Sequence, residues 1–135
     1  MSEVTLGPDA GRALQEAENF CWRANVAIVA ADHVLAGAMV VLAGQIAGLP
    51  SRESLEAALL MAHGSGSDKL TQNVMFGSSA RDAVSTVARW AREAGLTEIN
   101  ARMLALGVLA SGEVGPMFFS AAGVTKDELR TALEA

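Results

Sequence analysis

The stretch FGSSARDAVSTVARWAREAGLTEINARMLALGVLA (residues 76–110) decides the fold, because it is a second copy of LGPDAGRALQEAENFCWRANVAIVAADHVLAGAMV (residues 6–40). The two align without a gap at an offset of 70 residues. Apolar and small residues coincide throughout: Leu6 with Phe76, Ala10 with Ala80, Leu14 with Val84, Phe20 with Trp90, Val29 with Ile99, Leu35 with Ala105 and Gly37 with Gly107. Such self-similarity predicts a duplicated structural unit.

Each copy has the signals of helices separated by caps and glycines. In the second copy, Ser78 or Ser79 is predicted to cap a helix that Gly95 ends, and Asn100 to cap a helix over residues 101–110. Pro116 is placed to open a short helix closed by Gly123. Thr125 and Glu128 form a predicted capping box for the last helix.

The first copy follows the same plan in a shorter form. Helices are predicted over residues 8–24, 32–42 and 51–62, with a compressed third element before the last of them. HGSGSDKLTQNV, residues 63–74, is polar and glycine-rich, so it is predicted to be the linker. The predicted organisation is one domain over residues 1–135, with repeat one at about 6–62 and repeat two at about 75–135.

Composition favours an all-α protein. Apolar residues make up 51% of the 135 residues, but aromatics only 4%, and tyrosine is absent. Abundant alanine indicates closely packed helices rather than a β-sandwich. A net charge of −5 argues against nucleic acid as the partner. Cys21 is the single cysteine, which excludes an intrachain disulfide and is typical of the cytoplasm.

A membrane helix is the first alternative to consider, because residues 26–49 form an apolar stretch of sufficient length. Asp32, His33 and Gln45 lie inside it, and neither flank carries a cluster of positive charge. Charged side chains are costly within a lone membrane span. We therefore expect no membrane association.

Catalytic motifs are absent from the sequence. It contains no GxxxxGK[ST] phosphate loop, no GxSxG elbow, no HExxH and no CxxC. Asp32, His33 and His63 form a conceivable metal or acid/base cluster, but His63 falls in the predicted linker. The expectation is no enzyme activity, no metal and no cofactor, with a small hydrolase that uses Asp32 and His33 as the remote alternative.

The order and duplication of these segments resemble the N-terminal domain of the Clp family of AAA+ unfoldases, of the ClpC and ClpA type. That family usually has an F-[ST]-P-x-A-x-x-x-L helix and a Glu-His-Leu-Leu turn where this chain has residues 76–110. A Gly-Val-Ala-x-x-x-Leu-x-x-x-Gly-Val-x-x-x-x-Leu segment stands where this chain has GEVGPMFFSAAGVTKDELRTAL. The resemblance covers residues 6 to about 133 and implies an all-α fold of two pseudo-symmetric four-helix units.

The resemblance also implies a non-catalytic module that binds protein substrates, adaptors, phosphorylated arginine or cyclic peptide antibiotics. The family's phosphoarginine pockets each use a hydroxyl residue and a glutamate, which fall here on Gly7 and Gly77, and on Asp32 and Arg102. Only Asp32 keeps the required character, so we expect phosphoarginine recognition to be lost. The candidate binding positions are Leu6, Gly7, the neighbouring residues Asp9 and Ala10, Asp32, Phe76, Gly77, Ser78, Ser79 and Arg102.

Two biological contexts fit this expectation. The chain is either a stand-alone homologue that acts as adaptor, regulator or decoy for the ClpC protease machinery, or the substrate- and adaptor-docking domain of a full-length Clp ATPase. The start at Met1 and the end at the close of the last predicted helix favour the stand-alone context. Leu6 and Phe76 are expected at the edges of an apolar peptide groove, and Met103, Met117, Phe118, Phe119, Trp22 and Trp90 in the core.

Overall fold

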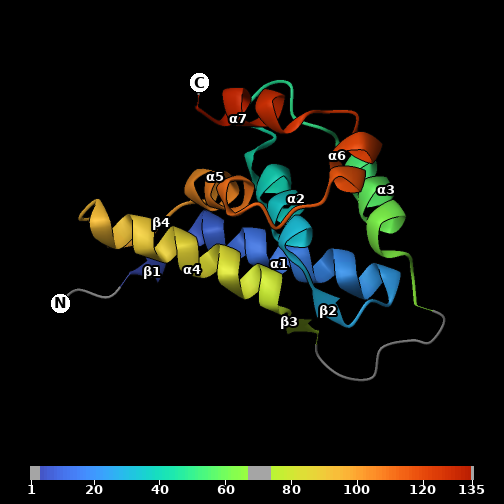
Figure 1. The fold of residues 1–135 in the computed structure, drawn as a ribbon, viewed down its shortest axis with the longest axis horizontal. Coiled ribbons are helices and arrows are strands. Elements are labelled where there is room, and N and C mark those ends of the chain that lie inside the picture. The colour runs from blue at the N-terminus through green and yellow to red at the C-terminus, as the bar shows by residue number, and fades with distance from the viewer. Residues whose placement is uncertain (1–3, 67–73, 135) are drawn as a thin grey trace.

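The computed structural model describes residues 4–66 and 74–134, and this part of the chain is all-α, as predicted (Figure 1). Its helices are α1 (Pro8–Ala24), α2 (Ala31–Leu42), α3 (Arg52–His63), α4 (Ser78–Glu93), α5 (Ala101–Ser111), α6 (Pro116–Ala122) and α7 (Lys126–Glu134). Four two-residue strands accompany them: β1 (Thr5–Leu6), β2 (Ile28–Val29), β3 (Met75–Phe76) and β4 (Glu98–Ile99). None of the described helices is long and apolar enough to cross a membrane.

The strands join the two halves of the chain crosswise. β1 pairs in parallel with β4, with Leu6 opposite Ile99, and β2 pairs in parallel with β3, with Val29 opposite Phe76. β3 begins 70 residues after β1, at residues 75 and 5, and β4 begins 70 residues after β2, at residues 98 and 28. The strands of the second unit therefore repeat those of the first at the offset seen in the sequence. This equal spacing supports the proposed duplication. Each strand of the first unit pairs with a strand of the second, so the strands link the two units.

The core lies where α2 and α5 pack on each other, with α1 against α2, α4 against α5, and α3 beside α6 (Figure 1). α2 is buried on nearly every side. At Gly37 a Cβ atom would lie 2.1 Å from the backbone oxygen of Ala13, and at Gly107 it would lie 2.0 Å from Cγ2 of Val87. These two aligned glycines therefore let α1 approach α2, and α4 approach α5, more closely than any side chain would permit.

Most helix ends are those that the sequence predicts. The Asn100 side chain accepts from the backbone N–H of Met103, and Gly123 ends α6 with a left-handed backbone. The capping box is present in full: Glu128 accepts from the N–H of Thr125, and the Thr125 hydroxyl accepts from the N–H of Glu128. The local signals thus specify the ends of α5, α6 and α7.

Three local expectations are wrong. Neither Ser78 nor Ser79 caps α4, because Gly77 is its N-cap; the hydroxyl of Ser79 instead accepts from the N–H of Ala31 in α2, at 3.1 Å. Residues 43–48 form turns and a bend, so the compressed third element of the first unit is not a short helix like α6 of the second. α3 continues to His63, which is therefore a helical residue, while residues 67–73 of the predicted linker lie outside the described part of the chain.

Candidate functional site

An apolar groove opens between α1 and α4. Its volume is about 500 Å³. The lining residues are Leu14 of α1, Phe76 of β3, and Ala80, Arg81, Val84 and Ser85 of α4. Leu14, Phe76 and Val84 are half-buried, so their apolar surface remains partly available to a ligand. Leu6 is 43% exposed in β1 but does not line the groove, whereas Phe76 does.

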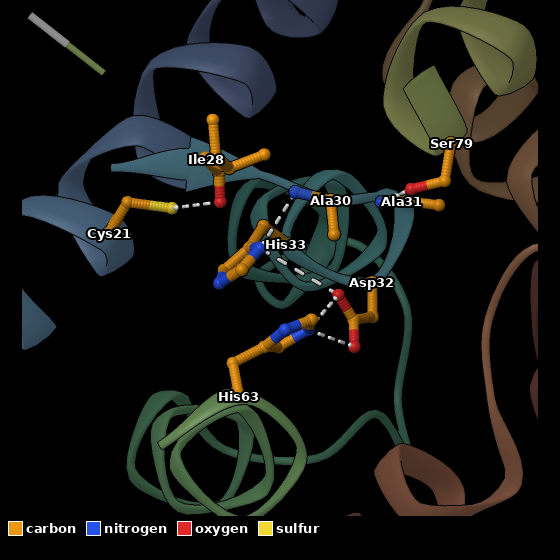
Figure 2. Close-up of polar contacts among 8 residues, drawn as sticks. All are labelled: Cys21, Ile28, Ala30, Ala31, Asp32, His33, His63 and Ser79. Carbon is orange, nitrogen blue, oxygen red and sulfur yellow. Dashed lines mark hydrogen bonds and ion pairs between the residues drawn. The ribbon is translucent and has the colours of Figure 1, made fainter. Parts of the chain in front are cut away.

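A second feature joins Asp32 in the first turn of α2 to His63 at the end of α3. Nε2 of His63 lies 2.7 Å from both carboxylate oxygens of Asp32, and Figure 2 shows the two side chains pointing toward each other. Asp32 is only 6% exposed, whereas the His63 side chain is 28% exposed. The Asp32 carboxylate therefore bonds to a side chain of another helix, and not to the backbone N–H groups that first-turn carboxylates often accept.

His33 lies beside this pair and is 2% exposed. Its Nδ1 accepts from the backbone N–H of Ala30 at 2.9 Å and lies 3.7 Å from Oδ1 of Asp32. The two imidazole rings stack with centroids 4.5 Å apart (Figure 2). The bond to Ala30 requires an unprotonated Nδ1, which fixes the neutral tautomer of His33 with its proton on Nε2.

The two histidines have pKa values displaced in opposite directions. Burial lowers the pKa of His33 to about 4, against an opposing effect of Asp32. The hydrogen bond to Asp32 raises the pKa of His63, and burial opposes this shift only in part. One imidazole is thus held neutral while its neighbour favours the charged form, as expected when burial dominates one ring and a carboxylate the other.

A second cavity, of about 450 Å³, opens beside the Asp32–His63 pair. The polar side chains that line it are Asp32, His63, Ser79 and Glu113, and Met117 and Phe118 of α6 line its apolar part. The structure thus brings Asp32 together with Ser79 of the other unit. Leu6, Gly7, Asp9, Ala10 and Arg102 line neither this cavity nor the groove.

Gly7 and Gly77 have ordinary extended backbones, so their φ angles do not require glycine. The space beside them is occupied: a Cβ atom at Gly7 would lie 2.7 Å from Oε1 of Glu98, and one at Gly77 would lie 2.7 Å from Cγ2 of Ile28, and both of these side chains are exposed. A side chain of the partner strand therefore fills the volume next to each glycine. A hydroxyl-bearing residue at either position would have to displace it.

The second unit's counterpart of Asp32 is Arg102, a half-buried residue in the first turn of α5. In the first unit, the carboxylate of Asp9, which is another candidate position, accepts from the N–H of Ala10 at the start of α1. The pair of acidic positions that the family resemblance implies is thus reduced to Asp32 alone.

The remaining candidates are mostly structural. Cys21 is fully buried, its thiol donates to the backbone oxygen of Ile28 at 3.7 Å, and burial raises the thiol pKa to about 12. A thiol with so high a pKa is a poor nucleophile. Phe118 is buried as expected, but Trp22 (38%), Trp90 (37%) and Met117 (55%) are more exposed than core residues.

The architecture just described is that of a Clp N-terminal domain, as the resemblance implies. A solved structure with this fold is the N-terminal domain of the caseinolytic protease associated chaperone ClpD from Arabidopsis thaliana, which is similar with a TM-score of 0.75. The alignment covers 96% of this chain and 92% of that one at 14% sequence identity, so the likeness concerns the fold alone. Comparisons of the sequence with protein-family models and with curated proteins find no match.

His63 is the cluster residue that the sequence places in a linker, whereas the structure places it at the end of α3. A signal for it exists: Leu55 and Leu59 set a helical spacing that reaches His63 four residues later, and Gly64 follows as a stop. Histidine is moreover favoured in the last turn of a helix. These signals place His63 on α3, but not its contact with Asp32, which depends on how α3 packs on α2.

Proposed function

We propose that this chain is a non-catalytic module that binds proteins or peptides in the groove between α1 and α4. The observation that carries the proposal is the groove itself, which is apolar and lined by a half-buried Phe76, in a chain with the fold of a Clp N-terminal domain. Partly exposed aromatic side chains in grooves are common anchors for peptide ligands.

The lining of the groove indicates the kind of ligand. Leu14, Phe76 and Val84 offer apolar contact, while Arg81 and Ser85 offer hydrogen-bond donors on one side. A peptide that inserts an apolar side chain and presents a carbonyl or carboxylate group toward Arg81 would fit this arrangement. The proposed partners are therefore protein substrates, adaptors or cyclic peptides, and no nucleic acid is required.

The proposed context is the ClpC-type protease machinery, where the chain would act as adaptor, regulator or decoy and would sequester cyclic peptides that target ClpC. The alternative is a docking domain that delivers substrates to an attached Clp ATPase. Continuation of the natural reading frame into a Walker-bearing domain distinguishes the two. In either context the cytoplasm is the proposed location.

Phosphoarginine is not among the proposed ligands. Glu98 and Ile28 fill the space next to Gly7 and Gly77, and Arg102 is of the wrong charge for a guanidinium. The carboxylate of Asp32 is already bonded to His63 through both oxygens. A phosphoarginine ligand would therefore have to break that pair and displace a strand side chain.

The hydrolase alternative has little support from the geometry. Asp32 is bonded to His63, and Nδ1 of His33 accepts from Ala30, so neither group is positioned to activate a water for attack. An Asp32→Ala/His33→Ala double variant separates the two classes. Loss of a hydrolytic turnover with unchanged peptide binding would overturn the proposal of a non-catalytic module.

The proposal is tested by titrating the chain with a fluorescent cyclic peptide that targets ClpC, beside a pull-down from cytoplasmic extract. We expect saturable binding of the peptide, and chemical-shift changes in NMR spectra that concentrate on Leu14, Phe76 and Val84. Failure of both experiments, with the groove shown to be accessible, would contradict the docking proposal.

A further inference from the structure

Three side chains of metal-ligating type meet at the junction of α2 and α3 (Figure 2). Asp32 and His33 are consecutive residues in the first turn of α2, and His63 is the last residue of α3. Each offers one ligand atom, and these atoms all lie within 4.8 Å of one another. Two imidazole nitrogens and one carboxylate oxygen form a donor set typical of zinc and related ions.

The distances within the cluster are close to those of a metal site. Nε2 of His63 lies 2.7 Å from Asp32, and Nδ1 of His33 lies 3.7 Å from it. Ligand atoms about 2.0–2.2 Å from a tetrahedral zinc ion stand roughly 3.3 Å apart. Shifts of about 1 Å or less in these two separations, and of about 1.5 Å or less in the third, which is at most 4.8 Å, would seat an ion. The hydrogen bond between His63 and Asp32 would then be replaced by two metal–ligand bonds.

The state of the two histidines suits this chemistry. A metal takes the lone pair of a neutral imidazole, and Nδ1 of His33, which accepts from the N–H of Ala30, is unprotonated and faces Asp32 (Figure 2). Coordination through this atom would replace its bond from the N–H of Ala30. His63 would lose the proton that it donates to Asp32, so metal binding is expected to release protons and to weaken at acidic pH.

The cavity beside the cluster provides access and room for further ligands. Asp32 and His63 line it, and its volume of about 450 Å³ is large enough for water molecules on an ion. Ser79 and Glu113 line the same cavity and make part of its wall polar. The cluster is thus reached from solvent without opening the core.

We propose that Asp32, His33 and His63 bind one divalent transition-metal ion of the zinc type, which links the start of α2 to the end of α3. This site is separate from the groove between α1 and α4, so its failure and the failure of peptide docking are distinguishable. The competing account is that the three side chains form a hydrogen-bonded cluster that needs no ion.

The experiment uses the full chain, stripped with a chelator and titrated with Co²⁺ and with Zn²⁺. We expect one equivalent of Co²⁺ to give visible absorption bands of a protein-bound ion, and Zn²⁺ to displace it. The chain has two histidines in all, so NMR of their ring nitrogens reports both candidate ligands without ambiguity. Nε2 of His63 and Nδ1 of His33 should shift on addition of Zn²⁺.

Variants make the test specific. His63→Ala lies at a helix end and should retain the fold by circular dichroism while Co²⁺ binding weakens at least tenfold; Asp32→Asn should act likewise. Asp82→Asn, on an unrelated face of α4, is the matched control and should bind as the parent does. Absence of stoichiometric binding by the parent, or equal binding by His63→Ala, would overturn the proposal. If His63→Ala does not fold, the histidine NMR shifts of the parent decide alone.

Discussion

Nε2 of His63 lies 2.7 Å from each carboxylate oxygen of Asp32, although the two residues are 31 positions apart in the sequence. The bond ties the end of α3 to the start of α2, at a place where Asp32 is nearly inaccessible to water. A buried carboxylate is stable only with partners, so this contact is expected to contribute to folding.

His63→Ala is therefore predicted to lower the free energy of unfolding by about 1–3 kcal/mol, because it leaves the Asp32 carboxylate buried without that partner. Urea denaturation in the presence of a chelator measures the change. Arg130→Ala, which breaks the exposed pair between Arg130 and Asp127, is the control and should cost about 1 kcal/mol or less. Equal effects of the two substitutions would show that the Asp32–His63 pair has no special role.

Gly37→Ala is predicted to destabilise the chain by about 1–3 kcal/mol, because the added Cβ would lie 2.1 Å from the backbone of Ala13 and force α1 away from α2. Gly11→Ala in α1 is the matched control: its Cβ meets nothing within 4 Å, and alanine favours a helix over glycine by about 1 kcal/mol. Thermal unfolding of both variants tests the pair. A tolerated Gly37→Ala would contradict the close crossing of α1 and α2.

The two histidines of the metal-free chain are predicted to titrate far apart. The pKa of His33 is lowered from 6.5 to about 4, so the neutral ring contributes its full stabilisation above pH 6.5. This contribution is lost as the pH falls toward 4, because the unfolded chain takes up a proton that the folded chain does not. His63 has a raised pKa, so its contribution is fully present below pH 6.5 and is lost as the pH rises through its folded value. NMR of the ring nitrogens with chelator present should resolve two separate titrations. A single shared midpoint near 6.5 would contradict the assigned environments.

The thiol of Cys21 is predicted to resist alkylation in the folded chain, because it is fully buried and its pKa is raised to about 12. Iodoacetamide at neutral pH should label it at least tenfold more slowly in the native chain than in urea. Rapid labelling of the native chain would show that α1 and β2 open more readily than the structure implies.

Much of the fold could be predicted from the sequence, because its helix ends carry local signals. Asn100, Thr125 and Glu128 cap helices through contacts made within four residues, so each signal is visible in the sequence itself. The strands could not be predicted, because a two-residue strand is too short to show an alternating pattern. Their crosswise pairing is a property of the assembled units.

The candidate site was harder to predict for the same physical reason. Ser79 has the features of a helix cap, but its hydroxyl bonds to Ala31 on another helix, 48 positions away. Asp32 begins the helix that the sequence predicts over residues 32–42, yet its partner comes from the end of α3. Periodicity and capping report on contacts within a helix, whereas these contacts depend on how the helices pack.

The central claim, that the groove between α1 and α4 binds peptides, is tested most directly by fluorescence anisotropy of a labelled ClpC-targeting cyclic peptide with three chains. The chains are the parent, Phe76→Ala and Met75→Ala, where Met75 is the 68% exposed neighbour of Phe76 that does not line the groove. We predict that Phe76→Ala weakens binding at least tenfold, as removal of a buried aromatic anchor does, and that Met75→Ala binds as the parent. Equal affinity of all three chains, with each fold intact by circular dichroism, would contradict the claim.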